Sequence, residues 1–210
     1  MPNWCVNKVR IEGLAVNVES FKEKHFNTEN EFDFNTIVTM PTELESTSTP
    51  ENEHILYAFY GISTDRLTTL FYSKSDLTET TQNSAMMSKA PFVKELYDKH
   101  GYVSWYQWAL ANWSTKWNAS DTYLEDIRYF SDGSAMLTFE FSTAWSHPQA
   151  IYEKLAVMYP ELIVTAQFDE ESGEYYGSFR SENTEVETYT EDGYRKDGPF
   201  SSSDDDFEED

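Results

Sequence analysis

The stretch YLEDIRYFSDGSAMLTFEF, residues 123–141, decides the fold class. Asp132-Gly133 in its middle is a strong two-residue turn signal, because glycine accepts the positive φ that a tight hairpin requires. The half that follows the turn places apolar residues at alternate positions: Ala135, Leu137, Phe139 and Phe141. This alternation is typical of a strand with one buried face. We therefore predict a hairpin of two strands, over residues 123–130 and 135–141.

Further elements extend this hairpin in both directions. Upstream, the pattern predicts a strand over residues 4–12 that Gly13 ends, a helix over 15–26 and a short extended piece over 32–37. Downstream, a helix begins near Ser146, carries Ile151, Leu155 and Met158 at helical spacing, and ends at Pro160. Apolar residues then alternate from Leu162 to Phe168, and a last strand is expected over 175–180 after a turn at Glu171-Ser172-Gly173.

Residues 42–121 form a mainly helical insertion between these elements. Short helices are expected over 54–60 and 66–72, and a further helix over 105–113. Two stretches rich in Ser, Thr and Glu, residues 43–52 and 78–88, predict loops, and Pro91 is expected to open a helix over 92–99.

Apart from the helical insertion and an extra strand at the end, over 175–180, the predicted elements follow the order β-α-β-β-α-β. This is the order of a ferredoxin-like α+β domain, in which helices lie on one face of an antiparallel sheet. We assign it to residues 1–181. Residues 182–210 hold 12 acidic residues against Arg195 and Lys196 and few aliphatic residues, so an acidic, disordered tail is expected there.

The charge and cysteine content restrict the environment and the partners. The chain has 38 Asp and Glu against 15 Lys and Arg, a net charge of −23, which repels DNA, RNA and anionic membranes. Cys5 is the single cysteine, so no intramolecular disulfide can form and a reducing compartment fits best. The first residues lack the basic and apolar regions of a signal peptide, so we expect a cytoplasmic protein.

Four separated motifs carry a family resemblance. They are Met1-Pro2-Asn3-Trp4-Cys5 with Asn7, Phe32-Asp33-Phe34-Asn35 running to Met40-Pro41, Asn112-Trp113-Ser114-Thr115-Lys116-Trp117, and Phe141-Ser142-Thr143-Ala144-Trp145-Ser146. Over about residues 1–180 the chain resembles a family of phage and plasmid proteins with a YubB-type ferredoxin-like domain. The family often has Gly where Ser114 stands and Pro where His147 stands. The resemblance implies the fold, a mobile-element origin and a bacterial host cytoplasm, and it supplies no reaction.

No catalytic constellation, cofactor motif or metal site is visible in the sequence. His25, His54, His100 and His147 do not have the spacing of metal ligands. Cys5 is expected to be a small core residue, because a nucleophilic cysteine would need a neighbouring base. Carboxylate pairs such as Glu125-Asp126 are expected to lie on a solvated face.

Trp and Asn residues concentrate in the family-like motifs. One interpretation is a pocket or platform that binds a small molecule or a peptide; the other, which we favour, is a core joining the insertion to the sheet. The residues of this predicted cluster are Trp4, Asn7, Asn35, Asn112, Trp113, Trp117 and Trp145.

The acidic character suggests a function that depends on charge. Roughly 20 excess carboxylates are equivalent to roughly 35–40 Å of duplex DNA, so a host protein with a basic surface, such as a nucleic-acid-handling or defence enzyme, is the expected partner. The acids expected to contact it are Asp169, Glu170, Glu171, Glu174, Asp204, Asp205, Asp206, Glu208, Glu209 and Asp210. The sequence thus predicts a mobile-element-encoded binding protein that inhibits or redirects a host protein. The alternatives are a module that binds a ligand through the Trp and Asn residues, and an enzyme with an unrecognised site.

Overall fold

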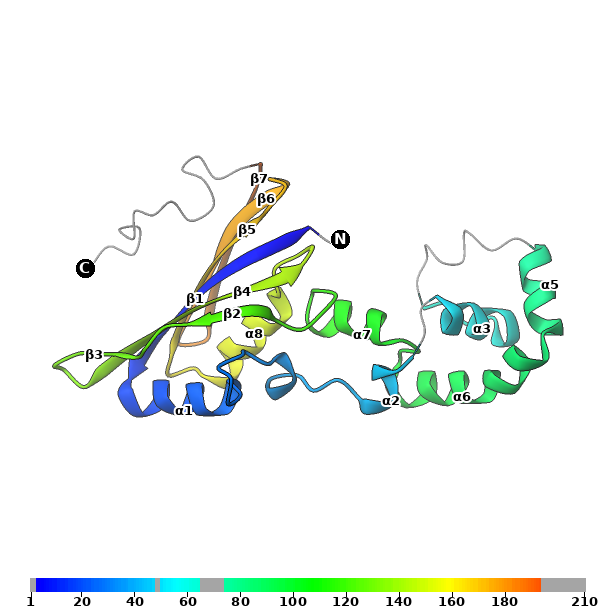
Figure 1. Ribbon diagram of the computed structural model, residues 1–210, viewed down its shortest axis with the longest axis horizontal. Coiled ribbons are helices and arrows are strands. Elements are labelled where there is room, and N and C mark those ends of the chain that lie inside the picture. Colours follow the sequence, from blue (N-terminus) through cyan, green and yellow to red (C-terminus); the bar gives the residue numbers. More distant parts are fainter. Residues whose placement is uncertain (1–2, 48–49, 65–73, 194–210) are drawn as a thin grey trace. The chain divides into compact units, whose positions relative to one another are not determined.

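A computed structural model describes residues 3–47, 50–64 and 74–193 of the chain (Figure 1). The chain divides into two compact units. We call residues 40–111 the helical unit and the described residues on either side of it, 3–39 and 112–193, the sheet unit.

The sheet unit is an antiparallel sheet with helices on one face. Its strands lie in the order β2-β4-β1-β5-β6-β7, with β3 also paired to β4. Removal of the added strands β6 and β7 leaves the strand order of a ferredoxin-like α+β fold, which confirms the predicted fold class. The elements are β1 (Trp4–Leu14), α1 (Ala15–His25), the 3-10 helix η1 (Phe34–Thr36), β2 (Ser120–Leu124), β3 (Arg128–Tyr129), β4 (Ser134–Ala144), α8 (Gln149–Met158), β5 (Ile163–Glu170), β6 (Tyr175–Glu182) and β7 (Glu185–Asp192).

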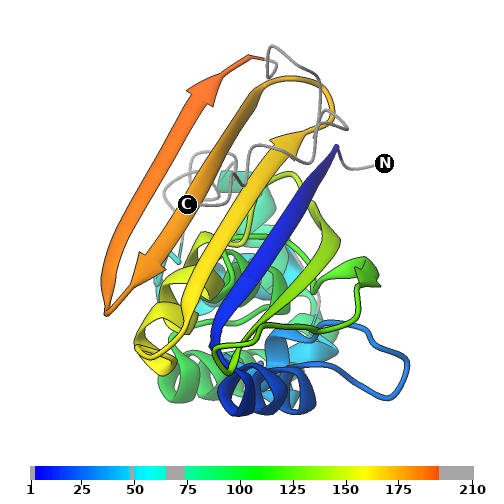
Figure 2. The ribbon, with the colours of Figure 1, turned by 90° about the vertical axis from the view of Figure 1, so that its left-hand side faces the viewer.

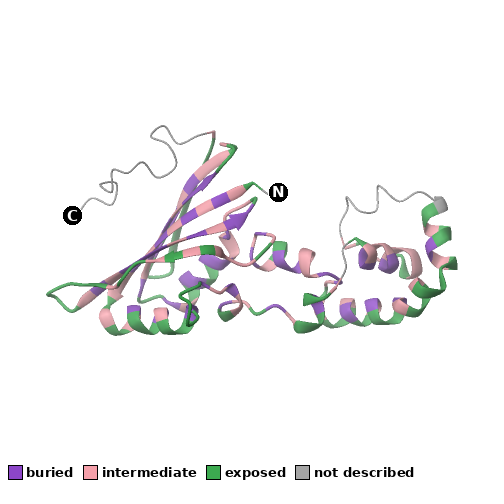
Figure 3. Ribbon diagram, in the orientation of Figure 1, coloured by how far each residue is buried: buried purple, intermediate pink, exposed green. Residues whose placement is uncertain are grey.

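The core lies between the sheet and its two helices. Figure 2 shows α1 and α8 on the same side of the sheet, and Figure 3 shows buried residues alternating with more exposed ones along the central strands. On β4, the four apolar residues predicted to face the core are all buried, as are Phe21 of α1 and Tyr152 of α8. The ring of Phe139 lies 6.4 Å from that of Phe21 and 4.9 Å from that of Phe32. Aromatic packing therefore fixes α1 and the segment before η1 onto the central strands.

Gly177 permits the close approach of β5, β6 and β7. A Cβ at this position would lie 2.1 Å from the backbone oxygen of Tyr189 and 2.6 Å from a ring carbon of Phe168. Only glycine avoids this overlap, because any other residue carries a Cβ.

Several predicted boundaries in the sheet unit are wrong. Gly13 does not end the first strand, which continues to Leu14. The strand predicted over 123–130 is two pieces, β2 and β3, with a register shift between Ser120 and Tyr123. The segment predicted as extended over 32–37 contains η1, whose start is capped by the Asp33 side chain accepting from the Asn35 N–H. Local side-chain caps of this kind compete with extended structure.

The expectation of a disordered tail from residue 182 is wrong for its first part. Residues 185–192 form β7, which pairs with β6 along its whole length. Asn183 and Thr184 both have positive φ, 51° and 70°, and form a two-residue turn that closes the hairpin. Val186, Thr188 and Thr190 then supply β-branched residues, which favour a strand despite the acidic composition. Residues 194–210 lie outside the described residues.

The helical unit contains, among its described residues, α2 (Thr42–Glu45), α3 (Glu51–Tyr60), α5 (Lys74–Gln82), α6 (Ser84–His100) and α7 (Trp105–Asn112), which ends one residue beyond the unit. The loop predicted over 43–52 contains most of α2 and the start of α3, and the loop predicted over 78–88 is helical except at Asn83. The Asn83 side chain caps α6 by accepting from the N–H groups of Ala85 and Met86, so the helix starts well before Pro91 and contains it. The helix predicted over 66–72 lies outside the described residues.

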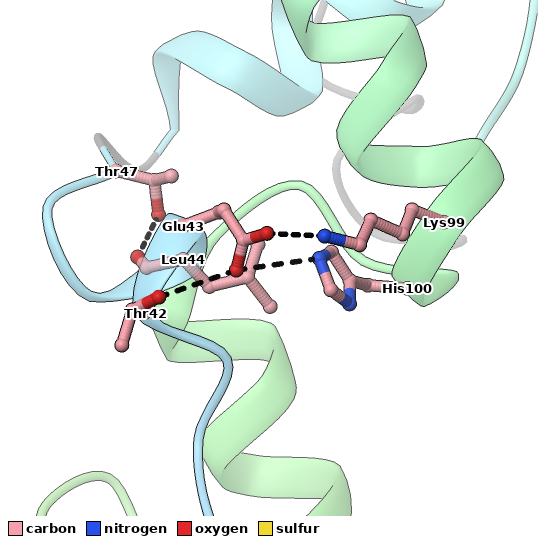
Figure 4. Close-up of polar contacts among 6 residues, drawn as sticks. All are labelled: Thr42, Glu43, Leu44, Thr47, Lys99 and His100. Carbon is pink, nitrogen blue, oxygen red and sulfur yellow. Dashed lines mark hydrogen bonds and ion pairs between the residues drawn. The ribbon is translucent and has the colours of Figure 1, made fainter.

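Polar contacts connect the helices of this unit. The Asn52 Nδ2 donates to the Val103 carbonyl at 2.7 Å, and the Ser104 hydroxyl donates to buried Glu53 at 2.5 Å. Figure 4 shows the carboxylate of Glu43 on α2 facing both Lys99 and His100 at the end of α6. The hydrogen bond from Lys99 is the main cause that lowers the pKa of Glu43 to about 2. Within the described parts of the chain, no helix has the length and apolar character needed to cross a membrane.

Candidate functional site

Three exposed or half-buried tryptophans and a lysine meet at one end of the sheet. The Lys116 Nζ lies 4.4 Å from the ring centroid of Trp117 and 4.6 Å from that of Trp145. The rings of Trp117 and Trp4 are 6.2 Å apart, at 45° to each other. We call Trp4, Lys116, Trp117 and Trp145 the tryptophan–lysine cluster.

The strands place two of its members. Trp4, the first residue of β1, pairs with Ala144, the last residue of β4. Trp145 comes directly after Ala144 in the chain and therefore lies near Trp4. The Trp145 N–H donates to the Asn3 carbonyl at 2.9 Å. Its φ of 69° is unusual for a bulky residue and costs about 1–3 kcal/mol, so the surrounding contacts must hold it.

The loop after α7 supplies the other two members. The Thr115 hydroxyl donates to the Ala144 carbonyl at 3.0 Å, and the Ser146 hydroxyl donates to the Ser114 carbonyl at 2.5 Å. The Ser114 side chain also accepts from the Ala150 N–H at 3.2 Å. These bonds fasten the loop to the β4–α8 connection and thereby hold Lys116 and Trp117 beside Trp145. Ser114 itself has φ of 63°, a conformation that suits glycine, the residue common at this position in the resembling family.

The cluster presents apolar surface to solvent. Trp117 is 39% exposed and Trp145 is 45% exposed. Attraction between an ammonium group and indole faces stabilises the arrangement by about 0.5–1 kcal/mol at exposed sites. Large rings that are held in place and remain accessible are the side chains that dominate recognition surfaces. Chemically, the cluster can stack on an aromatic or apolar group.

Two members of the predicted cluster belong to the core instead. Trp113 is buried, donates its indole N–H to the Val38 carbonyl at 2.9 Å and packs against Phe34. Asn7 is fully buried; its Nδ2 donates to Thr143 Oγ1 at 3.0 Å, and its Oδ1 accepts from the Tyr152 hydroxyl at 2.8 Å. Both residues are thus core residues of the sheet unit.

The remaining predicted residues are divided between the elements. Asn35 is part of η1, and Asn112 is the last residue of α7. The structure brings together Trp4, Trp117 and Trp145 and adds Lys116, which the sequence reasoning missed. The signal available in the sequence was the position of Lys116 directly before Trp117 in the third family-like motif.

The acids of the β5–β6 turn do not form one exposed patch. Asp169 and Glu170 are 3% and 2% exposed, so the expectation that both face a partner is wrong. Glu170 is buried because its Oε2 accepts from the N–H and hydroxyl of Ser172 and from the Glu174 N–H, which stabilises the turn. Glu171 and Glu174 are exposed. The predicted acids from Asp204 to Asp210 lie outside the described residues.

Cys5 is buried in a polar network that does not activate it. Its Sγ lies 3.5 Å from the Tyr175 hydroxyl, and burial raises the pKa of the thiol to about 12. His147 stacks on Phe168 at 3.7 Å, and burial lowers its pKa to about 4. A neutral buried thiol is a poor nucleophile. The described residues contain no group of three His, Cys, Asp or Glu suited to a metal ion.

The sheet unit is thus a ferredoxin-like α+β domain with an accessible aromatic cluster at one end. In agreement, residues 112–209 match the family model described as the ferredoxin-like domain in Api92-like protein. Among solved structures, the chain is similar to the crystal structure of protein api92 from Yersinia pseudotuberculosis, with 11% identity, a TM-score of 0.45 and coverage of 95% of this chain and 100% of that one. No curated protein matches the chain. The matched description names a fold and no reaction, and the phage or plasmid origin and the YubB type stay predictions.

Proposed function

We propose that the protein is a binding protein whose tryptophan–lysine cluster recognises a segment of a partner protein. The observation that carries this proposal is that two large rings, Trp117 and Trp145, are accessible to solvent. Six hydrogen bonds hold the backbone around them, between the loop after α7, the end of β4 and the neighbouring strands. An arrangement ordered before binding loses less entropy when the partner docks.

The strained backbone of Trp145 supports a binding role. A residue with φ of 69° would be more stable as glycine, yet an indole stands there and lies 45% exposed. Neither burial of the side chain nor the conformational preference of the backbone explains why a tryptophan occupies position 145. Strain of this kind concentrates at ligand-binding positions.

The charges define the partner's chemistry. The chain carries a net charge of −23, and Glu171, which accepts from the Trp4 N–H at 2.8 Å, places a carboxylate beside the cluster. The matching segment therefore presents an aromatic or apolar side chain flanked by lysine or arginine.

The cellular role we propose for this binding is inhibition or redirection of a host protein, such as a nucleic-acid-handling or defence enzyme with a basic surface. The resemblance to phage and plasmid proteins and the acidic composition support this role. Imitation of nucleic-acid charge is the broader form of the proposal. If it operates, duplex DNA competes with the protein for the partner, and the competition weakens steeply with salt.

Selection of random peptides on the immobilised full chain tests the proposal. We expect enrichment of peptides with an aromatic residue flanked by Lys or Arg, and about 30-fold weaker binding of a selected peptide to Trp145→Ala, the loss typical of a central contact residue. The matched control is Tyr123→Ala, which removes an aromatic side chain that is 64% exposed on β2. Equal losses in both variants, or no loss in Trp145→Ala, would overturn the proposal.

A further inference from the structure

The outer edge of β7 is a long, regular strand edge. β7 is the last strand of the described sheet on this side, and all eight of its residues are exposed. Its register with β6 runs without interruption from Glu182↔Glu185 to Tyr175↔Asp192. No bulge therefore interrupts the edge at which another strand could add.

Hydrogen-bonded and non-hydrogen-bonded residue pairs alternate along the β6–β7 hairpin, and this determines which backbone groups of β7 point outward. The Gly193 N–H donates to the Glu174 carbonyl, and hydrogen-bonded pairs recur at every second residue of an antiparallel ladder. Residues 185, 187, 189 and 191 therefore direct their N–H and C=O groups toward β6. Val186, Thr188, Thr190 and Asp192 direct theirs outward, where an added strand would bind.

The opposite edge of the sheet lacks this property. β2 and β3 are five and two residues long, and a register shift interrupts the pairing of β2 with β4. Short, irregular edges of this kind discourage strand addition. Of the two edges, β7 is the one that can accept a strand.

The side chains of β7 indicate what kind of strand fits. One face carries Glu185, Glu187, Tyr189 and Glu191, and the other carries Val186, Thr188, Thr190 and Asp192. An added strand places alternate side chains beside these two rows, because strand residues alternate between the faces of a sheet. We propose that the outer edge of β7 binds, as an added strand, an extended segment of a partner protein in which lysine or arginine alternates with β-branched residues.

Charge argues against two other occupants. A second copy of β7 would place its acids beside those of the first, and like charges on adjacent strands destabilise the pair. The chain's own residues 194–210 carry seven acids against two bases, so they meet the same repulsion. The carboxylates thus discourage self-pairing while they favour a basic strand.

This inference is independent of the tryptophan–lysine cluster, since it depends on backbone groups of β7 and on no residue of the cluster. One variant of each surface, Trp145→Ala for the cluster and Thr190→Pro for β7, tests the two proposals separately. Trp145→Ala should leave strand addition unchanged if both proposals hold.

Binding of a capped peptide that alternates lysine with valine, eight residues long to match β7, tests the proposal. We expect binding to the full chain and slowed hydrogen exchange of the outward N–H groups of Val186, Thr188 and Thr190. Thr190→Pro should weaken binding at least about tenfold, because proline removes an outward donor and leaves the bonds to β6 in place. Thr190→Ala, which keeps that donor, is the matched control and should bind as the original chain does.

Three outcomes would overturn the proposal. The peptide fails to bind; or Thr190→Pro, folded by circular dichroism, binds it as well as Thr190→Ala does; or a peptide of the same composition with its lysines in one block binds equally well. The last two results would mean that charge alone attracts the peptide.

Discussion

Trp113 and Trp145 lie in opposite environments although both belong to the family-like motifs. Trp113 is 4% exposed and donates to Val38, whereas Trp145 is 45% exposed on strained backbone. Trp113→Ala should lower the free energy of unfolding by about 3–5 kcal/mol, as expected for a large buried ring. Trp145→Ala should change it by less than about 1 kcal/mol. Urea unfolding of both variants measures the difference, and equal destabilisation would show that Trp145 is a core residue.

His25 is buried in its neutral form. Thr36 Oγ1 donates to the Asp33 carbonyl, so it accepts from Nδ1–H of His25, and Nε2 of His25 accepts from the Tyr159 hydroxyl. Burial is the main cause that lowers the pKa of His25 from 6.5 to about 4. A second proton would turn Nε2 into a donor, so it would remove the hydrogen bond that the Tyr159 hydroxyl donates.

This depressed pKa predicts a pH dependence. Between pH 6.5 and about 4 the unfolded imidazole binds a proton that the folded one does not. The stabilisation from His25 is therefore complete above pH 6.5 and is lost as the pH falls through about 4. Unfolding free energies at several pH values should fall less steeply for His25→Gln than for the original chain. Parallel curves would contradict the assignment of a neutral, buried His25.

At the scale of elements, Gly177 controls how closely β6 and β7 approach. Gly177→Ala should lower the free energy of unfolding by about 1–3 kcal/mol or more, because its Cβ would meet both backbone and a packed ring. Gly133→Ala is the control: its φ is 89° and nothing lies within 4 Å of its Cβ, so it should cost about 1 kcal/mol of backbone strain. Thermal unfolding of the pair distinguishes crowding from strain. A smaller cost at Gly177 than at Gly133 would argue against the close approach.

The elements also show what a sequence reveals about this fold. Alternation in β4 and β5 predicted their buried residues, because each strand faces a core on one side. Helical spacing predicted buried Ile151 and Leu155 of α8 but missed Tyr152 and Ala156, and the predicted Met158 is only half-buried. The start of α6 was not predicted, since its signal is a single Asn83 cap that outweighs a more visible Pro91. β7 was not predicted because its acidic composition is typical of a disordered tail. Pairing with β6 offsets the repulsion between these acids, and composition alone does not indicate such a pairing.

For the whole molecule, the candidate site depends on contacts that are distant in sequence. The motifs named Trp4, Trp117 and Trp145, but only the pairing of β1 with β4 and the fixed loop after α7 bring them together. Trp113 differs from Trp117 and Trp145 in its solvent exposure, and no sequence pattern predicted this difference. The burial of Asp169 and Glu170 was likewise not predictable, because acidic residues are usually exposed and these two are buried.

The most direct test of the central claim follows the indole N–H signals of the six tryptophans by NMR while a selected basic, aromatic peptide is added. Trp4, Trp117 and Trp145 should shift together with one affinity, and the buried Trp113 should stay unchanged. Shifts at Trp113, Trp105 or Trp108 with none in the cluster would contradict a binding site formed by the tryptophan–lysine cluster.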